Sequence, residues 1–237
     1  MKSTRKLTLL NKKNKTKKRY KLDLIVYCFW TGTNKMSTDR KACLDSMEPK
    51  IGCKVVCIYA KDVNKYILPK HPLHEAYEYL SETHKADYLR TYFMNFYGGG
   101  YSDIKKSSGS WINSFKKLQN SDAWVIGYKE KGAKGVAGPP SLKAKWQDLI
   151  GNCAYICKPN TAFTNEWYDE MMSLLDKKLD KLKQFPSTFP QDCAEKSPGK
   201  YPIEWNEMLG RIFHRLNYKY KDHFMNTLPP TISKNYR

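Results

Sequence analysis

The residues best suited to chemistry lie within one stretch of the chain, residues 84–105. Asp87 and Arg90 are three residues apart in a segment with the pattern of a helix that is buried on most sides, so the two side chains share one helix face. Three glycines at positions 98–100 follow, where they permit positive φ and a close approach of the backbone. The stretch predicts a helix, a glycine turn and the end of a buried strand.

Tyr101, Asp103 and Lys105 come directly after the glycines, and the period of two in a β-strand places all three on one face. Together with Asp87 and Arg90, they bring two carboxylates, two cations and a phenol to a gap opened by glycine. Such a set suits an anionic, hydroxyl-rich ligand such as a nucleotide sugar. The alternative for the helix residues is a simple intrahelical ion pair, worth only about 0.2–0.5 kcal/mol when exposed.

An apolar run at residues 23–30 has the length of a strand and is followed by a turn that contains Gly32. Open α/β sheets begin with such a buried strand and glycine turn, and they bind ligands at the carboxyl ends of their strands. Trp30, Thr31 and Gly32 would then lie at the mouth of the site. The alternative for Trp30 is a purely structural place in the core.

Hydrophobic periodicity in the rest of the chain predicts further strands and helices. We expect strands at residues 53–59, 123–128 and 152–157, and helices at 36–47, 111–119 and 164–185. A short helix or turn is expected at 62–67, and residues 73–80 are expected to begin the helix that carries Asp87. Loops are expected at 129–145 and 185–202, and an irregular closing segment at 216–237.

The run from Asp87 to Lys105, D-x-x-R and then G-G-x-Y-x-D-x-K, resembles the SD-x-x-R…GG-x-Y-x-D-x-D signature of the DXD glycosyltransferases. The sequence is most similar to small capsular-polysaccharide-type and large-virus members of that group. The resemblance is tight over about residues 71–105 and looser at 30–32 and 201–215. One departure stands out, because Lys105 replaces the second acid of the DXD.

The resemblance implies a GT-A-like (Rossmann-related) single α/β domain over residues 22–237, with a mixed central sheet flanked by helices. Residues 22–128 would form the nucleotide-sugar-binding half and residues 129–237 the acceptor-binding half. The implied activity is transfer of a hexose or pentose from a UDP- or GDP-sugar to a glycan acceptor, in capsule or glycoprotein glycan synthesis. The donor-binding residues implied are Trp30, Thr31, Gly32, Asp87, Arg90, Gly99, Tyr101 and Asp103.

In the DXD families, Mn²⁺ or Mg²⁺ held by the aspartates bridges the diphosphate oxygens of the donor. Here the ammonium of Lys105 would repel a divalent cation and is able to pair with the diphosphate itself. Three outcomes stay open: transfer without metal, a metal held by Asp103 with water and phosphate, and an inactive site. By the same resemblance, Asp87 and Arg90 would hydrogen-bond sugar hydroxyls.

An inverting enzyme needs a carboxylate that deprotonates the acceptor hydroxyl. Asp192, Glu195, Glu204 and Glu207 lie in the acceptor half, and the resemblance favours Glu207 because an acid precedes Leu-Leu-Gly in related sequences. The sequence leaves open the choice among these acids and the choice between inversion and retention. The catalytic residues that we predict are Asp103, Lys105, Glu207 and Asp192.

The net charge of +19 is concentrated near the start, where residues 1–21 contain ten lysines or arginines and no acid. Subtracting these ten leaves about +9 for the remaining chain, which fits a site that holds diphosphate. We expect residues 1–21 to be a basic, flexible, solvated tail, with contact to an anionic membrane surface as the alternative.

Two other classes of protein compete with a transferase. A basic nucleic-acid-binding protein would fit the charge, but no helix-turn-helix, zinc-finger or RNP-like signature is present, so nucleic acid is a poor candidate for a partner. A catalytically inactive sugar-binding relative is the other alternative. Hydrolysis of a nucleotide sugar would separate that alternative from an enzyme.

Seven cysteines are scattered through the chain, and the spacings of Cys53/Cys57 and Cys153/Cys157 differ from those of common zinc knuckles. We interpret the cysteines as small buried residues with reduced thiols, as in cytosolic proteins. No apolar run approaches the roughly 20 residues of a membrane-spanning helix, and no signal-peptide core follows the first charges. These features predict a cytoplasmic protein.

Overall fold

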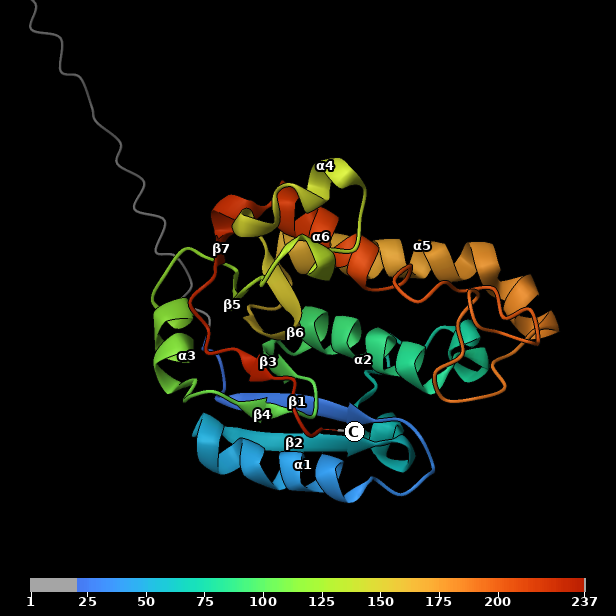
Figure 1. Ribbon diagram of the computed structural model, residues 1–237, viewed down its shortest axis with the longest axis horizontal. Coiled ribbons are helices and arrows are strands. Elements are labelled where there is room, and N and C mark those ends of the chain that lie inside the picture. The colour runs from blue at the N-terminus through green and yellow to red at the C-terminus, as the bar shows by residue number, and fades with distance from the viewer. Residues whose placement is uncertain (1–20, 237) are drawn as a thin grey trace, which may run out of the picture.

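A six-stranded mixed sheet forms the centre of the computed structural model, which describes residues 21–236 (Figure 1). The strand order is β2-β1-β3-β6-β5-β7, with β1 parallel to β2 and β3, and β6 antiparallel to β3 and β5. The strands are β1 (Ile25–Trp30), β2 (Lys54–Tyr59), β3 (Gly99–Ser102), β5 (Val125–Lys129), β6 (Ile150–Cys157) and β7 (Phe224–Met225). The carboxyl ends of β1, β2 and β3 therefore meet at one edge of the sheet.

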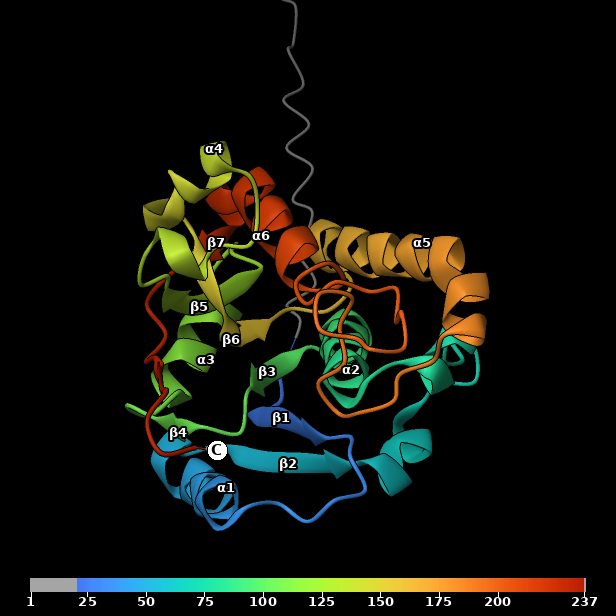
Figure 2. The same ribbon diagram turned by 45° about the vertical axis from the view of Figure 1, so that its right-hand side comes forward.

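Helices cover both faces of this sheet, as the turned view also shows (Figure 2). One face packs against α1 (Thr38–Ile51) and α3 (Ile112–Gln119), the other against α2 (Glu82–Phe96), α5 (Ala162–Gln184) and α6 (Gly210–Lys219). Alternation along β1 supplies both cores, because Val26 and Cys28 face α1 and α3 while Phe29 faces α2. The predicted α/β fold, a mixed central sheet flanked by helices, is confirmed.

Side-chain caps fix where the principal helices begin. The Ser81 hydroxyl accepts a hydrogen bond from the backbone N–H of His84 and so starts α2. Thr161 and Thr164 form a capping box at the start of α5. The start of α2 matters most, because this helix carries Asp87 and Arg90 toward the edge of the sheet.

Glycines join α2 to β3 at a point where a Cβ atom would clash with neighbouring residues. Gly98 has φ of 67°, and a Cβ there would lie 2.5 Å from Cδ of Pro159. A Cβ on Gly100 would lie 2.9 Å from Cγ2 of Val26, so the missing side chain lets β3 sit close against its neighbours. The predicted glycine turn is confirmed, although β3 already begins at Gly99.

Most expected elements are present, but three expectations need correction. The segment at 62–67 is a short helix as expected, the 3₁₀ helix η1 (Ala60–Tyr66), but the segment at 73–80 does not begin α2 and forms a separate 3₁₀ helix, η2 (Glu75–Tyr79). The loop at 129–145 contains η3 (Ala133–Gly135) and α4 (Pro140–Lys143), with η4 (Trp146–Asp148) just after it. The closing segment is not wholly irregular, since after the end of α6 it contains η5 (Lys221–His223), strand β7 and strand β8 (Thr231–Ile232), which pairs with β4 (Lys106–Ser107). The predicted tail falls on residues 1–20, which lie outside the described residues, and on Lys21.

The cysteines behave as the sequence suggested. All seven are free thiols, and Cys28, Cys43, Cys53, Cys157 and Cys193 are buried. Within residues 21–236, no helix is long and apolar enough to span a bilayer.

Replacing Gly98 by alanine should test the turn between α2 and β3. We expect Gly98→Ala to lower the free energy of unfolding by about 2–4 kcal/mol, because it adds left-handed strain and a clash with Pro159. Gly132→Ala is the matched control, since a Cβ there meets nothing within 4 Å, and it should change the free energy by less than about 0.5 kcal/mol. Equal effects of the two variants in urea denaturation would contradict this account of the turn.

Candidate functional site

A cavity of about 390 Å³ lies at the edge where β1 and β3 end. Its wall brings together residues that are far apart in the sequence: Trp30, Thr31 and Gly32 after β1, Glu82 and Arg90 from α2, Tyr101, Asp103 and Lys105 from β3 and beyond, and Pro190, Gln191, Trp205 and Tyr236 from the later half. The place agrees with the rule that open α/β sheets bind ligands at the carboxyl ends of their strands. We take this cavity, called the central cavity below, as the candidate site.

Arg90 is held rigidly in the wall of the central cavity. Its guanidinium lies 3.1 Å from a carboxylate oxygen of Asp87, donates to the carbonyl of Asn152 at 3.0 Å and sits 4.3 Å above the ring of Tyr101. The Arg90 residue is 8% exposed, so its positive charge is poorly screened by water. The predicted shared face of Asp87 and Arg90 is therefore confirmed, as a buried pair rather than an exposed one.

Asp103 and Lys105 form a second ion pair directly beside Arg90. The Lys105 ammonium donates to Oδ2 of Asp103 at 2.9 Å, and the Tyr101 hydroxyl donates to Oδ1 at 2.7 Å. The Arg90 guanidinium lies 3.6 Å from that same Oδ1. The predicted convergence of these side chains is confirmed.

The backbone that produces this convergence differs from the expected strand. Regular pairing in β3 stops at Ser102, and the N–H of Lys105 donates to the carbonyl of Asp103 at 2.7 Å. This tight turn folds Lys105 back onto Asp103. Strand alternation is therefore the wrong explanation for a correct prediction of proximity.

Electrostatics keep both members of the second pair charged. Burial acts to raise the pKa of Asp103, but the positive charges of Lys105 and Arg90 outweigh it and the pKa is lowered. Burial acts to lower the pKa of Lys105, but Asp103 outweighs it and raises the pKa to about 12. Lys105 is thus an ammonium throughout the physiological range.

Asp87 lies behind Arg90 and does not line the central cavity. Burial, helped by the nearby charge of Asp103, raises the pKa of Asp87 to about 7, while Arg90 acts in the opposite direction. The Asp87 residue is 4% exposed and touches Arg90 rather than open space. Its geometry is that of a group that positions Arg90.

The side chains at Asp103 do not fit a divalent cation. Both carboxylate oxygens of Asp103 already accept hydrogen bonds from the ammonium of Lys105 and the hydroxyl of Tyr101. A second acid is missing because Lys105 occupies that place, and residues 21–236 contain no group of three or more histidine, cysteine or acidic residues that could hold a metal. A cation at Asp103 would also be repelled by the Lys105 ammonium, 2.9 Å from Oδ2, and by the Arg90 guanidinium, 3.6 Å from Oδ1.

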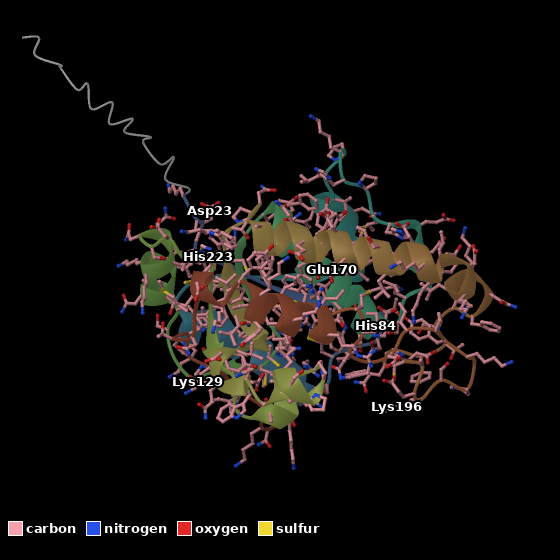
Figure 3. The ribbon with its side chains drawn as sticks, turned by 90° about the horizontal axis from the view of Figure 1, so that it is seen from above. Asp23, His84, Lys129, Glu170, Lys196 and His223 are labelled. Atoms are coloured by element: carbon pink, nitrogen blue, oxygen red, sulfur yellow. The ribbon has the colours of Figure 1, made fainter. Side chains whose placement is uncertain are left out.

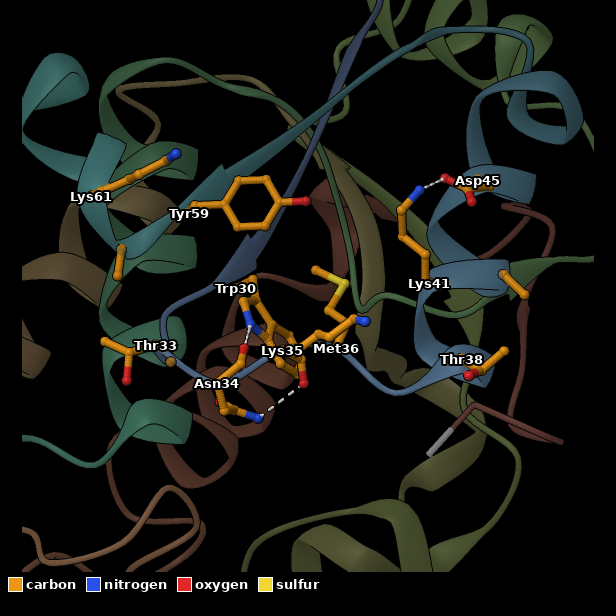
Figure 4. Close-up of a pocket in the computed structure, with 13 residues that line it drawn as sticks. Trp30, Thr33, Asn34, Lys35, Met36, Thr38, Lys41, Asp45, Tyr59 and Lys61 are labelled. Carbon is orange, nitrogen blue, oxygen red and sulfur yellow. Dashed lines mark hydrogen bonds and ion pairs between the residues drawn. The ribbon is translucent and has the colours of Figure 1, made fainter.

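A larger cavity of about 780 Å³ adjoins the central cavity and shares Trp30, Gly32 and Asn34 with it. It lies among the carboxyl ends of β1 and β2 and the start of α1, and Figure 4 shows Tyr59 and Lys41 on opposite sides of it. The indole N–H of Trp30 donates to the carbonyl of Asn34 at 2.8 Å and fixes the ring between the two cavities. We call this space the Trp30 cavity.

Several residues predicted for the site lie elsewhere. Gly99 is at the opposite end of β3, where a Cβ would lie 3.0 Å from the carbonyl of Ile25. Asp192 is fully buried and accepts hydrogen bonds from the backbone and hydroxyl of Thr188, which fixes the loop that presents Pro190. Neither Gly99 nor Asp192 lines the central cavity.

Glu207 also has a structural role. Its Oε2 accepts hydrogen bonds from Lys178 at 2.7 Å and from the backbone of Glu204 at 3.0 Å, so it holds the turn that carries Trp205. The carboxylate of Glu195 accepts from the backbone N–H of Trp205. Neither Glu204, Glu207 nor Glu195 lines the central cavity.

Among the lining residues that the sequence did not predict, Glu82 and Tyr236 are the most informative. Glu82 sits in the first turn of α2, and among the described residues its Oε2 is buried with no hydrogen-bond partner. Tyr236 reaches the wall because the closing segment folds back, and Lys105 and Arg40 lie 4.8 and 5.1 Å from the centre of its ring. Glu82 carried a weak signal as an acid near Asp87, whereas nothing local in the sequence places Tyr236.

Comparison with known proteins decides the family. A family model described as "Capsular polysaccharide synthesis protein" matches residues 1–121, just over half of the 237 residues. The chain belongs to the capsular polysaccharide synthesis protein family. This membership confirms the predicted likeness to capsular-type sequences, and the matched region includes the whole run from Asp87 to Lys105.

One solved structure, titled "PaToxG Glycosyltransferase", is similar to this chain with a TM-score of 0.46 and 14% sequence identity. The match covers 84% of this chain and 69% of that one. A search of curated proteins finds no match.

The shifted pKa values of Asp87 and Asp103 should make stability depend on pH in opposite directions. The raised pKa of Asp87 means that the folded protein keeps a proton that the unfolded chain loses above about pH 4. This contribution to stability is therefore present below about pH 4 and is lost as the pH rises to about 7. Asp103, with a lowered pKa, contributes above about pH 4 and loses that contribution as the pH falls.

We expect Asp87→Asn to flatten the loss of unfolding free energy between about pH 4 and 7. Asp103→Asn should instead remove part of the loss of stability below about pH 4. Urea denaturation across this pH range measures both slopes. Identical pH profiles for the two variants would contradict the opposite pKa shifts.

Proposed function

We propose that this protein is a glycosyltransferase that moves a sugar from a UDP- or GDP-sugar to a glycan acceptor. The observation that carries the proposal is the pair of buried cations, Lys105 and Arg90, in a cavity at the carboxyl ends of β1 and β3. Membership of the capsular polysaccharide synthesis protein family supports it and favours capsule or a related glycan as the product. Seven free thiols suit work in the cytoplasm.

The chemistry explains why two cations are needed. Transfer breaks the bond between the anomeric carbon of the sugar and an oxygen of the diphosphate, and negative charge grows on the leaving diphosphate. Fixed positive charges in a site with little water stabilise that charge more than flexible, hydrated ones do. Lys105 and Arg90, which are 7% and 8% exposed, are such charges.

Each acidic residue next to these cations has a positioning role in the proposal. Asp103 holds the Lys105 ammonium at 2.9 Å and keeps it protonated, while Asp87 holds the Arg90 guanidinium from behind at 3.1 Å. Because the pKa of Asp87 is raised to about 7, this acid is only partly ionised near neutral pH, and the two acids and two bases together carry a net positive charge there. An arriving diphosphate would therefore meet oriented cations with a net attraction.

The nucleoside part of the donor would occupy the Trp30 cavity. Its volume of about 780 Å³ lies in the range of about 300–1,000 Å³ that is usual for small-molecule sites. Trp30, Gly32 and Asn34 border both cavities, so a ligand can extend from one into the other past Trp30. A base and ribose beside Trp30 would leave the diphosphate facing Lys105.

Glu82 is our candidate for the carboxylate that accepts the proton of the acceptor hydroxyl. It lines the central cavity, as does Asp103, whose oxygens are taken by Lys105 and Tyr101. In the Glu82 carboxylate, by contrast, Oε1 accepts one long hydrogen bond from Lys85 at 3.3 Å, and Oε2 has no partner among the described residues. The predicted bases Glu207 and Asp192 are replaced in this proposal, because both hold loops away from the cavity wall.

Transfer should not require a metal ion, since the charge that Mn²⁺ or Mg²⁺ would supply comes from Lys105. We expect wild-type turnover of a UDP- or GDP-sugar to persist in EDTA. Lys105→Ala should reduce kcat by about 10²–10³-fold, the loss typical of removing one group that stabilises transition-state charge. The measurement is release of nucleoside diphosphate in a screen of UDP- and GDP-sugars with and without Mn²⁺.

Lys106→Ala is the matched control, because Lys106 is the next residue in the chain and its side chain is exposed. It should leave kcat within about twofold of wild type. Lys105→Arg keeps the positive charge and should retain part of the activity. Activity in this variant would show that the loss in Lys105→Ala comes from the missing charge and not from unfolding. Activity that is lost in EDTA and restored by Mn²⁺, with Lys105→Ala fully active, would contradict the proposal, and no hydrolysis of any donor would favour an inactive sugar-binding protein.

A further inference from the structure

A third cavity, of about 460 Å³, lies next to the central cavity on the side of α6. Trp205 lines both cavities, so a ligand in one can touch a ligand in the other. The remaining wall comes from the segment 134–138, Lys143, Asn206 and Arg211. We call this space the Trp205 cavity.

Close packing fixes the two walls of the Trp205 cavity relative to each other. The N–H of Ala137 donates to Nδ1 of His214 at 3.0 Å and ties the 134–138 segment to α6. A Cβ on Gly210 would lie 2.8 Å from Cβ of Ala137, so the glycine permits this approach. The cavity is thus part of the packed structure rather than a gap beside a loose loop.

Backbone hydrogen bonds hold Trp205 at the boundary between the cavities. Its N–H donates to the Glu195 carboxylate, and Glu207 with Lys178 fixes the same turn. His84, a buried residue in the first turn of α2, and Lys196, on the outer loop, lie at the same end of the molecule (Figure 3). The Lys196 ammonium lies 5.6 Å from the centre of the Trp205 ring. Trp205 is nevertheless 38% exposed, which leaves part of its surface open between the two cavities.

The charge of the Trp205 cavity is positive. Lys134, Lys143 and Arg211 line it, and no acidic side chain does. Glu204 forms an ion pair with Arg211 from outside the lining, and Glu130 lies behind Gly135, where it faces His214. Two lysines therefore keep their charge uncompensated by the acids near the cavity.

We propose that the Trp205 cavity binds the acceptor and that the acceptor is an anionic glycan, with a carboxylate or phosphate group. This inference rests on the proposed function, because it assigns the second substrate of the same transfer. A sugar ring against Trp205 would place one hydroxyl in the central cavity and its anionic group among Lys134, Lys143 and Arg211. An indole gives such a ring a flat apolar surface with a polar edge.

The residues described above account for each bond and proton in the proposed transfer step. The acceptor oxygen forms a bond to the anomeric carbon of the donor sugar, and the bond from that carbon to the diphosphate oxygen breaks with its electron pair. The proton of the acceptor hydroxyl passes to Glu82. The products are the extended glycan and a nucleoside diphosphate, whose charge lies against Lys105 and Arg90.

Binding without donor tests the proposal directly. Calorimetric titration of the whole protein with methyl glucoside, methyl glucuronide and methyl glucoside 6-phosphate compares a neutral sugar with two anionic ones. We expect at least one anionic sugar to bind about tenfold or more tightly than the neutral one, and to lose about tenfold in Lys134→Ala/Lys143→Ala. Preference for the glucuronide indicates a carboxylate acceptor, and preference for the phosphate a phosphorylated one.

The control double variant, Lys54→Ala/Lys116→Ala, removes two exposed lysines remote from the Trp205 cavity and should bind the anionic sugar as wild type does. Equal binding of all three sugars, or an unchanged affinity in Lys134→Ala/Lys143→Ala, would overturn the assignment of the acceptor. Titration of UDP and GDP into the same samples separates the two proposals. Nucleotide binding with no anionic preference overturns this inference alone, whereas absence of nucleotide binding overturns the proposed function.

Discussion

A row of four ionisable side chains, of which Asp87, Arg90 and Lys105 are buried and Asp103 is partly buried, is the constraint on which the rest of the site depends. Burying one such charge alone would cost several kcal/mol, and burying them as two neutral pairs avoids most of that cost. The pairs stay together only if α2, the turn at Gly98 and the turn after Ser102 all keep their geometry. The fold therefore holds the cations in place before any ligand arrives, which is what stabilising a developing charge requires.

The same row explains why one substitution in a motif changes the chemistry that we expect. An acid at position 105 would leave two carboxylates facing each other, a set that needs a cation between them. Lys105 supplies that positive charge from its own side chain, and its ammonium donates a hydrogen bond to an oxygen of Asp103. The positive charge next to a bound diphosphate is then similar, but it belongs to a side chain of the protein rather than to a bound metal ion.

The sequence predicted those parts of the molecule that depend on local pattern. The strands around Val26 and Ile156, the helices α2 and α5 and the glycine turn follow from periodicity and from the steric freedom of glycine. Tyr236 and strand β7 could not be predicted in the same way, because long-range pairing places them and their own residues carry no pattern. The short turn that brings Lys105 to Asp103 was likewise invisible, although strand alternation gave the right neighbours.

The acids of the later half show why composition alone misleads about catalysis. Glu207 and Asp192 have the right chemistry and lie in the expected half, yet each accepts hydrogen bonds that fix a loop. Those loops carry Trp205 and Pro190 to the central cavity, so the acids shape the site from outside it. Glu82, which the sequence did not single out, lies in the first turn of α2 and in the wall itself.

The central claim is that fixed cations of the chain bind the donor diphosphate, and a titration of UDP and uridine, or GDP and guanosine, in EDTA tests it most directly. We predict that the preferred diphosphate binds at least about tenfold more tightly than its nucleoside in wild-type protein. That difference should largely disappear in Lys105→Gln, while the affinity for the nucleoside stays the same. Equal affinities of nucleoside and diphosphate in wild-type protein, or diphosphate binding only after Mn²⁺ is added, would contradict the claim.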